Sequence, residues 1–213
     1  MLISFKHWLS HYRSTRGFSL VELVVSIGIL LIIISILVFR FTSFDSIILL
    51  RTLAYDIGLS IRQAQSYSLS AHGLSTGGSL EFDNPYGVSF TPGATSYAFF
   101  AYTGSNPVPR YETGEVQTID LYNLGRSFEI YDVCAGIGAV EHCGINRLDV
   151  SFRRPEYISL FYATNCSGSC SVAAIDKGII KIRSTRNPSV VARIEITYTG
   201  QIDACVEGAV GCP

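Results

Sequence analysis

The chain is organised around the segment Arg16-Gly17-Phe18-Ser19-Leu20-Val21-Glu22-Leu23, which continues as apolar sequence as far as Phe39. From Phe18 onward, only Glu22, three serines and one glycine interrupt the apolar residues. A helix of this length covers roughly 33 Å at about 1.5 Å per residue, which is enough to cross a bilayer. We therefore predict a membrane-spanning helix over residues 18–39.

Basic residues are distributed unequally on the two sides of this segment. Lys6, Arg13 and Arg16 precede it, whereas only Arg40 follows it closely. The positive-inside tendency places residues 1–17 in the cytoplasm and exports the rest. A secretory signal has a shorter apolar region of about 7–15 residues followed by a small-residue cleavage site, and no such site precedes Arg40. The pattern predicts a single-pass protein of the inner (cytoplasmic) membrane with an exported C-terminal domain.

Glu22 is the one carboxylate in the apolar segment. A carboxylate at the centre of a membrane helix costs about 2.5 to 3.5 kcal/mol, so it needs a partner or a function. Cleavage after Gly17 would give Phe18 an α-ammonium group at position i relative to Glu22 at i+4, on the same helix face. The positive N-terminal end of the helix would also favour the carboxylate.

This octapeptide and the apolar run after it resemble the processing signal of the type IV pilin superfamily, which includes pilins, minor pilins and secretion pseudopilins. The resemblance implies that a prepilin peptidase/methyltransferase cuts between Gly17 and Phe18 and methylates the Phe18 amine. It also implies that Glu22 pairs with a subunit's N-terminal amine during assembly with other pilin subunits, and that the helix becomes filament core. The alternative is an uncut anchor whose Glu22 snorkels toward the headgroups.

A second helical pattern follows a polar break at Thr42-Ser43, with Asp45 as a candidate N-cap. Small and apolar residues recur at spacings of three and four, which predicts one buried stripe: Ile47, Leu50, Ala54, Ile57, Ile61, Ala64, Ser68 and Ala71. Gly73 supplies a stop signal, and no proline lies between Phe18 and His72, so the two helical segments can join into one. Residues 50–65 also resemble the corresponding helix of the pseudopilin H and FimT-like minor pilin branch.

After this helix the sequence changes to short β-rich runs separated by Gly, Pro and Asn. The candidate strands are 80–82, 86–90, 97–102, 117–122, 127–133, 148–152, 157–162, 179–183 and 190–198. Thr91-Pro92-Gly93-Ala94 predicts a hairpin turn. The expected fold is α+β, with an antiparallel sheet laid on the long helix. The chain then divides into a leader (1–17), a spanning helix (18–39), an amphipathic helix (40–73) and a β-rich exported domain (74–213).

All six cysteines lie on the exported side of the predicted span. An even number of cysteines outside the cytoplasm favours disulfides, and six cysteines allow fifteen pairings. The local pairing is our expectation: Cys134 with Cys143, Cys166 with Cys170, and Cys205 with Cys212. The alternative is a zinc site built from Cys134, His142, Cys143, Cys166 and Cys170, and the loose spacings favour disulfides over it.

Charge is also divided along the chain. Residues 81–141 hold eight acids and two arginines, whereas residues 147–193 hold eight basic residues and three acids. Such asymmetry can complement a neighbouring copy or an acidic partner. A patch of four cations, Lys181, Arg183, Arg186 and Arg193, is the candidate for DNA binding.

The end of the chain argues against DNA. Residues 192–202 alternate around Gly200 and resemble the closing hairpin of the FimT-like branch. Members of that branch thought to bind DNA carry arginines after the turn glycine, where this chain has Gln201 and Asp203.

The function expected from the sequence is a prepilin-like subunit of a type IV pilus or a secretion pseudopilus, located first in the inner membrane and then in an extracellular or periplasmic filament. A binding module at a pilus tip, for DNA or a surface receptor, is the alternative from another class. No nucleophile, general-base or phosphate-loop motif is recognisable, so we expect neither an enzyme nor a cofactor.

Overall fold

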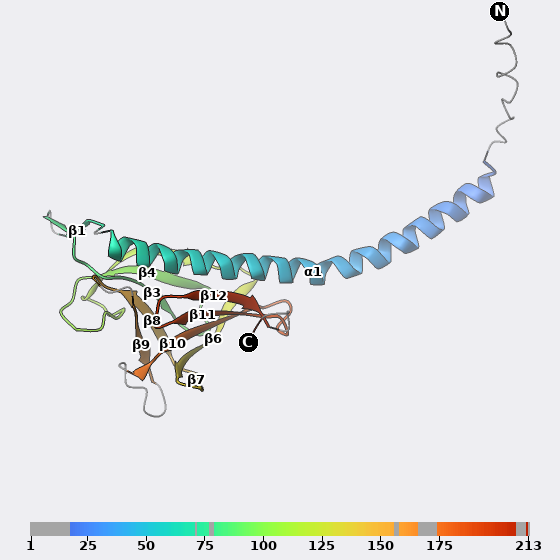
Figure 1. Ribbon diagram of the computed structural model, residues 1–213. Coiled ribbons are helices and arrows are strands. Elements are labelled where there is room, and N and C mark those ends of the chain that lie inside the picture. Colours follow the sequence, from blue (N-terminus) through green and yellow to red (C-terminus); the bar gives the residue numbers. More distant parts are fainter. Residues whose placement is uncertain are drawn as a thin grey trace, which may run out of the picture. The chain divides into compact units, whose positions relative to one another are not determined.

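The computed structural model describes residues 18–70, 72–76, 79–155, 158–165, 174–207 and 212 (Figure 1). One helix, α1 (Leu20–Leu69), precedes all of the strands. Contacts within the chain divide it into two compact units, Met1–Thr42 and Ser43–Pro213. The first unit contains the apolar start of α1, and the second contains the rest of α1 together with the strands.

The second unit is α+β, as the sequence predicts. After α1, the strands run in chain order as β1 (Leu74–Thr76), β2 (Ser79–Glu81), β3 (Tyr86–Phe90), β4 (Ser96–Tyr102), β5 (Val116–Asn123), β6 (Phe128–Ile137), β7 (Val140–Cys143), β8 (Arg147–Phe152), β9 (Ser159–Thr164), β10 (Lys177–Ser184), β11 (Val191–Thr197) and β12 (Ile202–Val206). Every pairing between them is antiparallel.

The strands form two five-stranded sheets rather than the single expected sheet. One sheet has the order β5-β4-β3-β8-β9 and the other has the order β12-β11-β10-β6-β7, while β1 and β2 form a separate hairpin. Two of the central pairings join strands that are distant in the sequence, β3 with β8 and β6 with β10. Alternation within a strand does not specify such non-local partners, and this is why the division into two sheets was not predicted.

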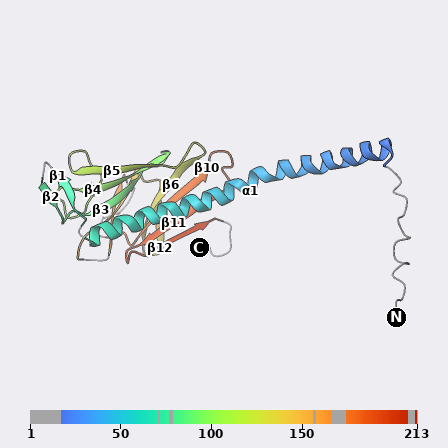
Figure 2. The same ribbon diagram turned by 90° about the horizontal axis from the view of Figure 1, so that it is seen from above.

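The core of the second unit lies between its part of α1 and the two sheets. Figure 2 shows this part of α1 lying over the strands of both sheets. The predicted stripe supplies Leu50, Ala54, Ile57, Ile61 and Ala64, all buried. They pack in one cluster with residues of both sheets, among them Val88, Phe99, Ile130, Ile180 and Ile194. Ser68 is buried as predicted, Ile47 is 39% exposed, and Ala71 lies outside the described residues.

The helix ends at Leu69, four residues before the predicted stop at Gly73. Backbone bonds from Ser70 N to Ser66 O (2.9 Å) and from His72 N to Tyr67 O (3.2 Å) close its last turn. The buried Ser68 hydroxyl accepts a hydrogen bond from the backbone N–H of Tyr86. This contact ties the end of the helix to the start of β3, so the chain leaves the helix earlier than periodicity alone indicates.

Several strand limits also differ from the predictions. The hairpin turn 91–94 joins β3 to β4 as predicted, and Gly93 adopts a φ of 80°, which favours glycine. The strands β1 and β7 were missed because they are short and lack a run of β-branched residues. Two of the predicted disulfides are present, Cys134 with Cys143 and Cys205 with Cys212. The third pair, Cys166 and Cys170, lies outside the described residues.

Candidate processing and assembly site, and the charged sheet faces

Two of the three residues that the sequence singles out lie at or just before the start of α1. Phe18 lies two residues before the helix and is 73% exposed, and Glu22 lies in the first turn, also exposed. The backbone N–H of Leu23 donates to Ser19 O at 3.1 Å, which closes that turn. Gly17 lies outside the described residues. A carboxylate in the first turn lies close to the unpaired N–H groups and the positive end of the helix, which favour its charge.

The apolar part of α1 follows directly. Leu20–Val38 is long and apolar enough to cross a membrane, and none of it is buried within the described structure. An exposed apolar surface of this size needs lipid or protein to cover it. Within this segment the Ser26 hydroxyl donates a hydrogen bond to the Glu22 carbonyl oxygen at 2.7 Å, one turn earlier in the helix. The segment is consistent with a single-pass membrane anchor.

A comparison with protein-family models matches residues 12–38 to the prokaryotic N-terminal methylation motif. The chain therefore carries a type IV pilin-like prepilin signal, as its Gly17-Phe18 junction and Glu22 predict. Comparisons with curated proteins and with solved structures found no match. The likeness of residues 50–65 and 192–202 to the FimT-like branch stays a prediction, because the matched motif lies upstream of both.

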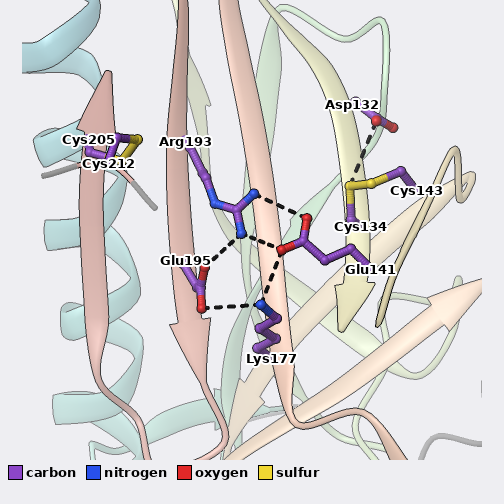
Figure 3. Close-up of polar contacts among 9 residues, drawn as sticks. All are labelled: Asp132, Cys134, Glu141, Cys143, Lys177, Arg193, Glu195, Cys205 and Cys212. Carbon is purple, nitrogen blue, oxygen red and sulfur yellow. Dashed lines mark hydrogen bonds and ion pairs between the residues drawn. A yellow bond between two sulfur atoms is a disulfide. The ribbon is translucent and has the colours of Figure 1, made fainter. Parts of the chain in front are cut away.

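The outer face of the β12-β11-β10-β6-β7 sheet carries a network of four charges (Figure 3). Arg193 on β11 makes a bidentate contact with Glu141 on β7. Arg193 Nη2 lies 2.6 Å from Glu141 Oε1, and Arg193 Nη1 lies 3.2 Å from Glu141 Oε2. Glu195 accepts from the same Nη2 at 2.8 Å. Lys177 Nζ lies 3.1 Å from Glu141 and 3.7 Å from Glu195. We call these four residues the charge network.

The charge network lies over a glycine and a buried isoleucine of its own sheet. Gly136 on β6 is directly opposite Lys177, whose side chain fills the space that a Cβ at position 136 would occupy. Ile179, on the same strand as Lys177, is completely buried. The hydrogen bonds from Arg193, followed by those from Lys177, lower the pKa of Glu141 to about 2. The network therefore links β7 to β10 and β11 by charge-assisted hydrogen bonds.

The four candidate DNA-binding cations are only partly available. Lys181 is directly opposite Arg193 on the neighbouring strand, so the structure brings these two to the same sheet face. However, Arg193 belongs to the charge network, and Arg183 Nε pairs with Glu129 at 2.6 Å while its guanidinium lies over the Tyr131 ring. Arg186 lies in the turn after β10 and is exposed. Because Arg183 and Arg193 are paired with carboxylates, they have less charge to offer a phosphate backbone.

Three of the residues that could hold a metal lie together on β6 and β7. One ligand atom each from Asp132, Cys134 and Cys143 falls within 4.8 Å of the others. The two sulfurs are bonded to each other, so neither is a thiolate that could bind zinc. Asp132 Oδ1 instead accepts from the backbone N–H groups of Val133 (2.9 Å) and Gly144 (3.0 Å). The arrangement holds the β6–β7 hairpin, as the disulfide prediction implies.

The other sheet has a buried acid on its outer face. Asp149 on β8 is fully buried and accepts hydrogen bonds from Ser89 Oγ (2.6 Å), Tyr111 N (2.9 Å) and Arg147 Nε (3.1 Å). Burial raises the pKa of Asp149, and the donors oppose that rise. Because Tyr111 belongs to the long β4–β5 connection, this contact fastens the connection to the sheet.

Sequence reasoning did not identify the charge network or the role of Asp149. One signal was available, because Arg193 and Glu195 are two residues apart on a strand and must lie on the same face. Glu141 on β7 joins them only through the non-local pairing of β6 with β10, so the sequence alone could not bring the four together.

Proposed function

We propose that this chain is a prepilin that is cleaved after Gly17, methylated at the Phe18 amine and assembled into a type IV pilus or a related pseudopilus. The observation that carries the proposal is the N-terminal methylation motif at residues 12–38. It is supported by the position of Glu22 in the first turn of α1 and by the exposed apolar segment that follows. In this account the protein is a structural subunit and turns over no substrate.

The proposed route places the chain first in the inner membrane, with residues 1–17 in the cytoplasm and the β-rich unit exported. The basic residues before the span support this orientation. The two disulfides support export as well, because disulfides persist in oxidising compartments. The span would then move from lipid into a filament, where other subunits cover its apolar surface.

Glu22 is the proposed assembly residue. Its carboxylate would pair with the N-terminal amine that maturation creates, on the same chain or on a neighbouring one. That pairing removes the cost of an isolated charge in an apolar environment, which gives assembly a directional contact that lipid does not offer. The proposed partners are therefore the prepilin peptidase/methyltransferase and other pilin subunits.

The experiment compares Glu22→Ala with Ser26→Ala in the host. Both changes remove a polar group from the same apolar segment, but only the first removes the proposed partner of the amine. We expect both variants to be matured, and only Glu22→Ala to be depleted from purified filaments. Wild-type incorporation of Glu22→Ala would contradict the assembly role of the carboxylate.

The contacts described above favour a structural subunit over a DNA-binding tip module. Two of the four candidate cations, Arg183 and Arg193, are held by carboxylates of their own sheet. A tip module for DNA would need salt-dependent retention of DNA by the matured protein, and we expect none at low salt.

A further inference from the structure

The part of α1 in the second unit exposes an apolar ridge to solvent. Ile48, Tyr55 and Leu59 are 62%, 59% and 67% exposed. At about 100° per residue they lie on one side of the helix, opposite the buried stripe through Leu50 and Ile57. We call these three residues the ridge. Such a surface on a helix is unusual unless another molecule covers it.

A groove runs along one side of the ridge, between α1 and the strands β4 and β5. Its volume is about 340 Å³, and its apolar lining includes Leu53, Leu59, Tyr97, Tyr122 and Leu124. The two tyrosine rings stack with their centroids 5.2 Å apart. Ser60 Oγ and the Tyr97 hydroxyl lie 2.8 Å apart at the base. Leu59 belongs both to the ridge and to the groove, so the two surfaces are continuous.

One acidic residue lines the groove and a second lies close to it. Asp56 lines the groove, and Asp120 lies close enough to Tyr97 to act on it as well. Burial is the main cause that raises the pKa of Tyr97 to about 12; the Ser60 hydrogen bond opposes the rise, and Tyr122, Asp56 and Asp120 add to it in that order. Among the residues that the structure describes, neither carboxylate is part of an ion pair, whereas Glu141, Glu195 and Glu129 are. Rings and uncompensated carboxylates together favour a cation with an apolar stem, as an arginine or lysine side chain has.

The opposite side of the ridge carries such cations. Arg51 and Arg62 are exposed and lie about 120° around the helix from Asp56. Gly58 marks the same side, since a Cβ placed there would lie 3.6 Å from Ile202 on β12. Neither arginine is in an ion pair within the described part of the chain. The helix therefore presents an acidic groove on its β5 side, an apolar ridge, and a basic flank on its β12 side.

We propose that the groove is the docking site for the Arg51 and Arg62 flank of a second copy of this chain. The contact joins two different surfaces, so it is heterologous, and each copy that docks leaves a free groove and a free flank for the next copies. The docked copy lies over the ridge beside the groove of the first copy, which removes exposed leucine, isoleucine and tyrosine surface from water. The proposal rests on the proposed function, because such a contact repeats into an open filament.

A small organic cation could occupy the groove alone, but it would leave most of the ridge exposed. Ile48 and Tyr55 lie outside the groove lining, and a helix laid along α1 covers them together with Leu59. A second copy also supplies both kinds of surface from the same chain, in equal number. Charge complementarity and the continuous apolar surface therefore both point to a copy of this chain as the occupant.

The test introduces a photo-crosslinking residue in place of Tyr55 and maps its products in filaments from the host. We expect a cross-link to residues 51–62 of a second copy. Asp56→Arg should lower its yield roughly tenfold, because arginine would then face arginine, and Arg51→Asp with Arg62→Asp should do the same. The chain that combines all three reversals restores opposite charges and should return within about twofold of the unmodified yield. Arg126→Asp, which changes the charge by two units as Asp56→Arg does but in the opposite direction, lies at an exposed turn and should have no effect.

The possible failures are distinguishable. A cross-link to a different pilin, or a triple reversal that is worse than either set alone, would overturn the docking proposal while the chain is still found in filaments, so the proposed function would stand. A chain that is matured but never enters a filament would overturn the proposed function and the docking proposal together.

Discussion

The Glu141 carboxylate on β7 contacts the Arg193 guanidinium on β11, although β6 and β10 lie between these two strands in the sheet. The contact is as short as 2.6 Å, and only 9% of the Arg193 side chain is exposed. It crosses the sheet over Gly136, where a larger residue would block the Lys177 side chain that joins the network. The Glu141–Arg193 ion pair thus ties the edge strand β7 to β11 across the two strands between them.

Glu141→Gln should destabilise the protein and change its acid dependence. The pKa of Glu141 is about 2 in the folded protein and close to 4.5 without its partners, so its stabilising effect is fully present above about pH 4.5 and is lost as the pH falls through 2. We expect the variant to lose about 2 kcal/mol at pH 7 and to show a flatter pH dependence of the free energy of unfolding between pH 2 and 4.5. Urea unfolding in detergent at several pH values measures this. Glu207→Gln, at an exposed position after β12, is the control, and equal slopes for the two variants would contradict the expectation.

Asp149→Ala should cost more stability than Asp149→Asn. The alanine variant removes the acceptor of three hydrogen bonds and leaves Arg147 next to a buried site without its carboxylate, which costs about 3 kcal/mol. An asparagine keeps one acceptor oxygen and avoids burying a charge, so its loss should be smaller. The midpoints of thermal unfolding of the two variants show which of them is less stable. Proteolysis of the β4–β5 connection should also increase in Asp149→Ala, because its anchor at Tyr111 is lost.

Two glycine-to-alanine changes should alter the free energy of unfolding in opposite directions. At Gly87 on β3 a Cβ would lie 2.6 Å from the Val150 carbonyl oxygen and 2.8 Å from the Phe100 ring, so we expect a loss of about 1 to 3 kcal/mol. At Gly58, inside α1, the nearest atom would be 3.6 Å away, and alanine should stabilise the helix by up to about 1 kcal/mol. Denaturant titration of the two variants is the measurement. Stabilisation by Gly87→Ala would contradict the tight β3–β8 packing.

The elements that sequence reasoning placed well are those whose signals are local. The buried stripe through Leu50, Ile57 and Ala64 follows from spacings within one helix. The hairpin at Gly93 follows from turn chemistry, and the disulfides Cys134–Cys143 and Cys205–Cys212 join residues close in the sequence. The prepilin signal is local as well, since its residues lie within eight positions.

What could not be predicted depends on pairings between distant strands. β3 pairs with β8, which lies some sixty residues later in the sequence, as the hydrogen bond from Ser89 to Asp149 illustrates. The groove between α1 and β5 could not be predicted either, because it depends on the stacking of Tyr122 on Tyr97 beside the helix. Charge counts along the chain gave a basic second half, but only the sheet register shows that Arg193 is held by Glu141 and Glu195.

Maturation creates the amine that pairs with Glu22 in the proposed function, and the mass of the intact protein recovered from host membranes and filaments, with its N-terminal residue determined, tests this step. We predict a chain that begins at Phe18, carries one methyl group on its amine and lacks residues 1–17. Recovery of the chain with residues 1–17 still attached, in cells whose prepilin peptidase is active, would contradict it.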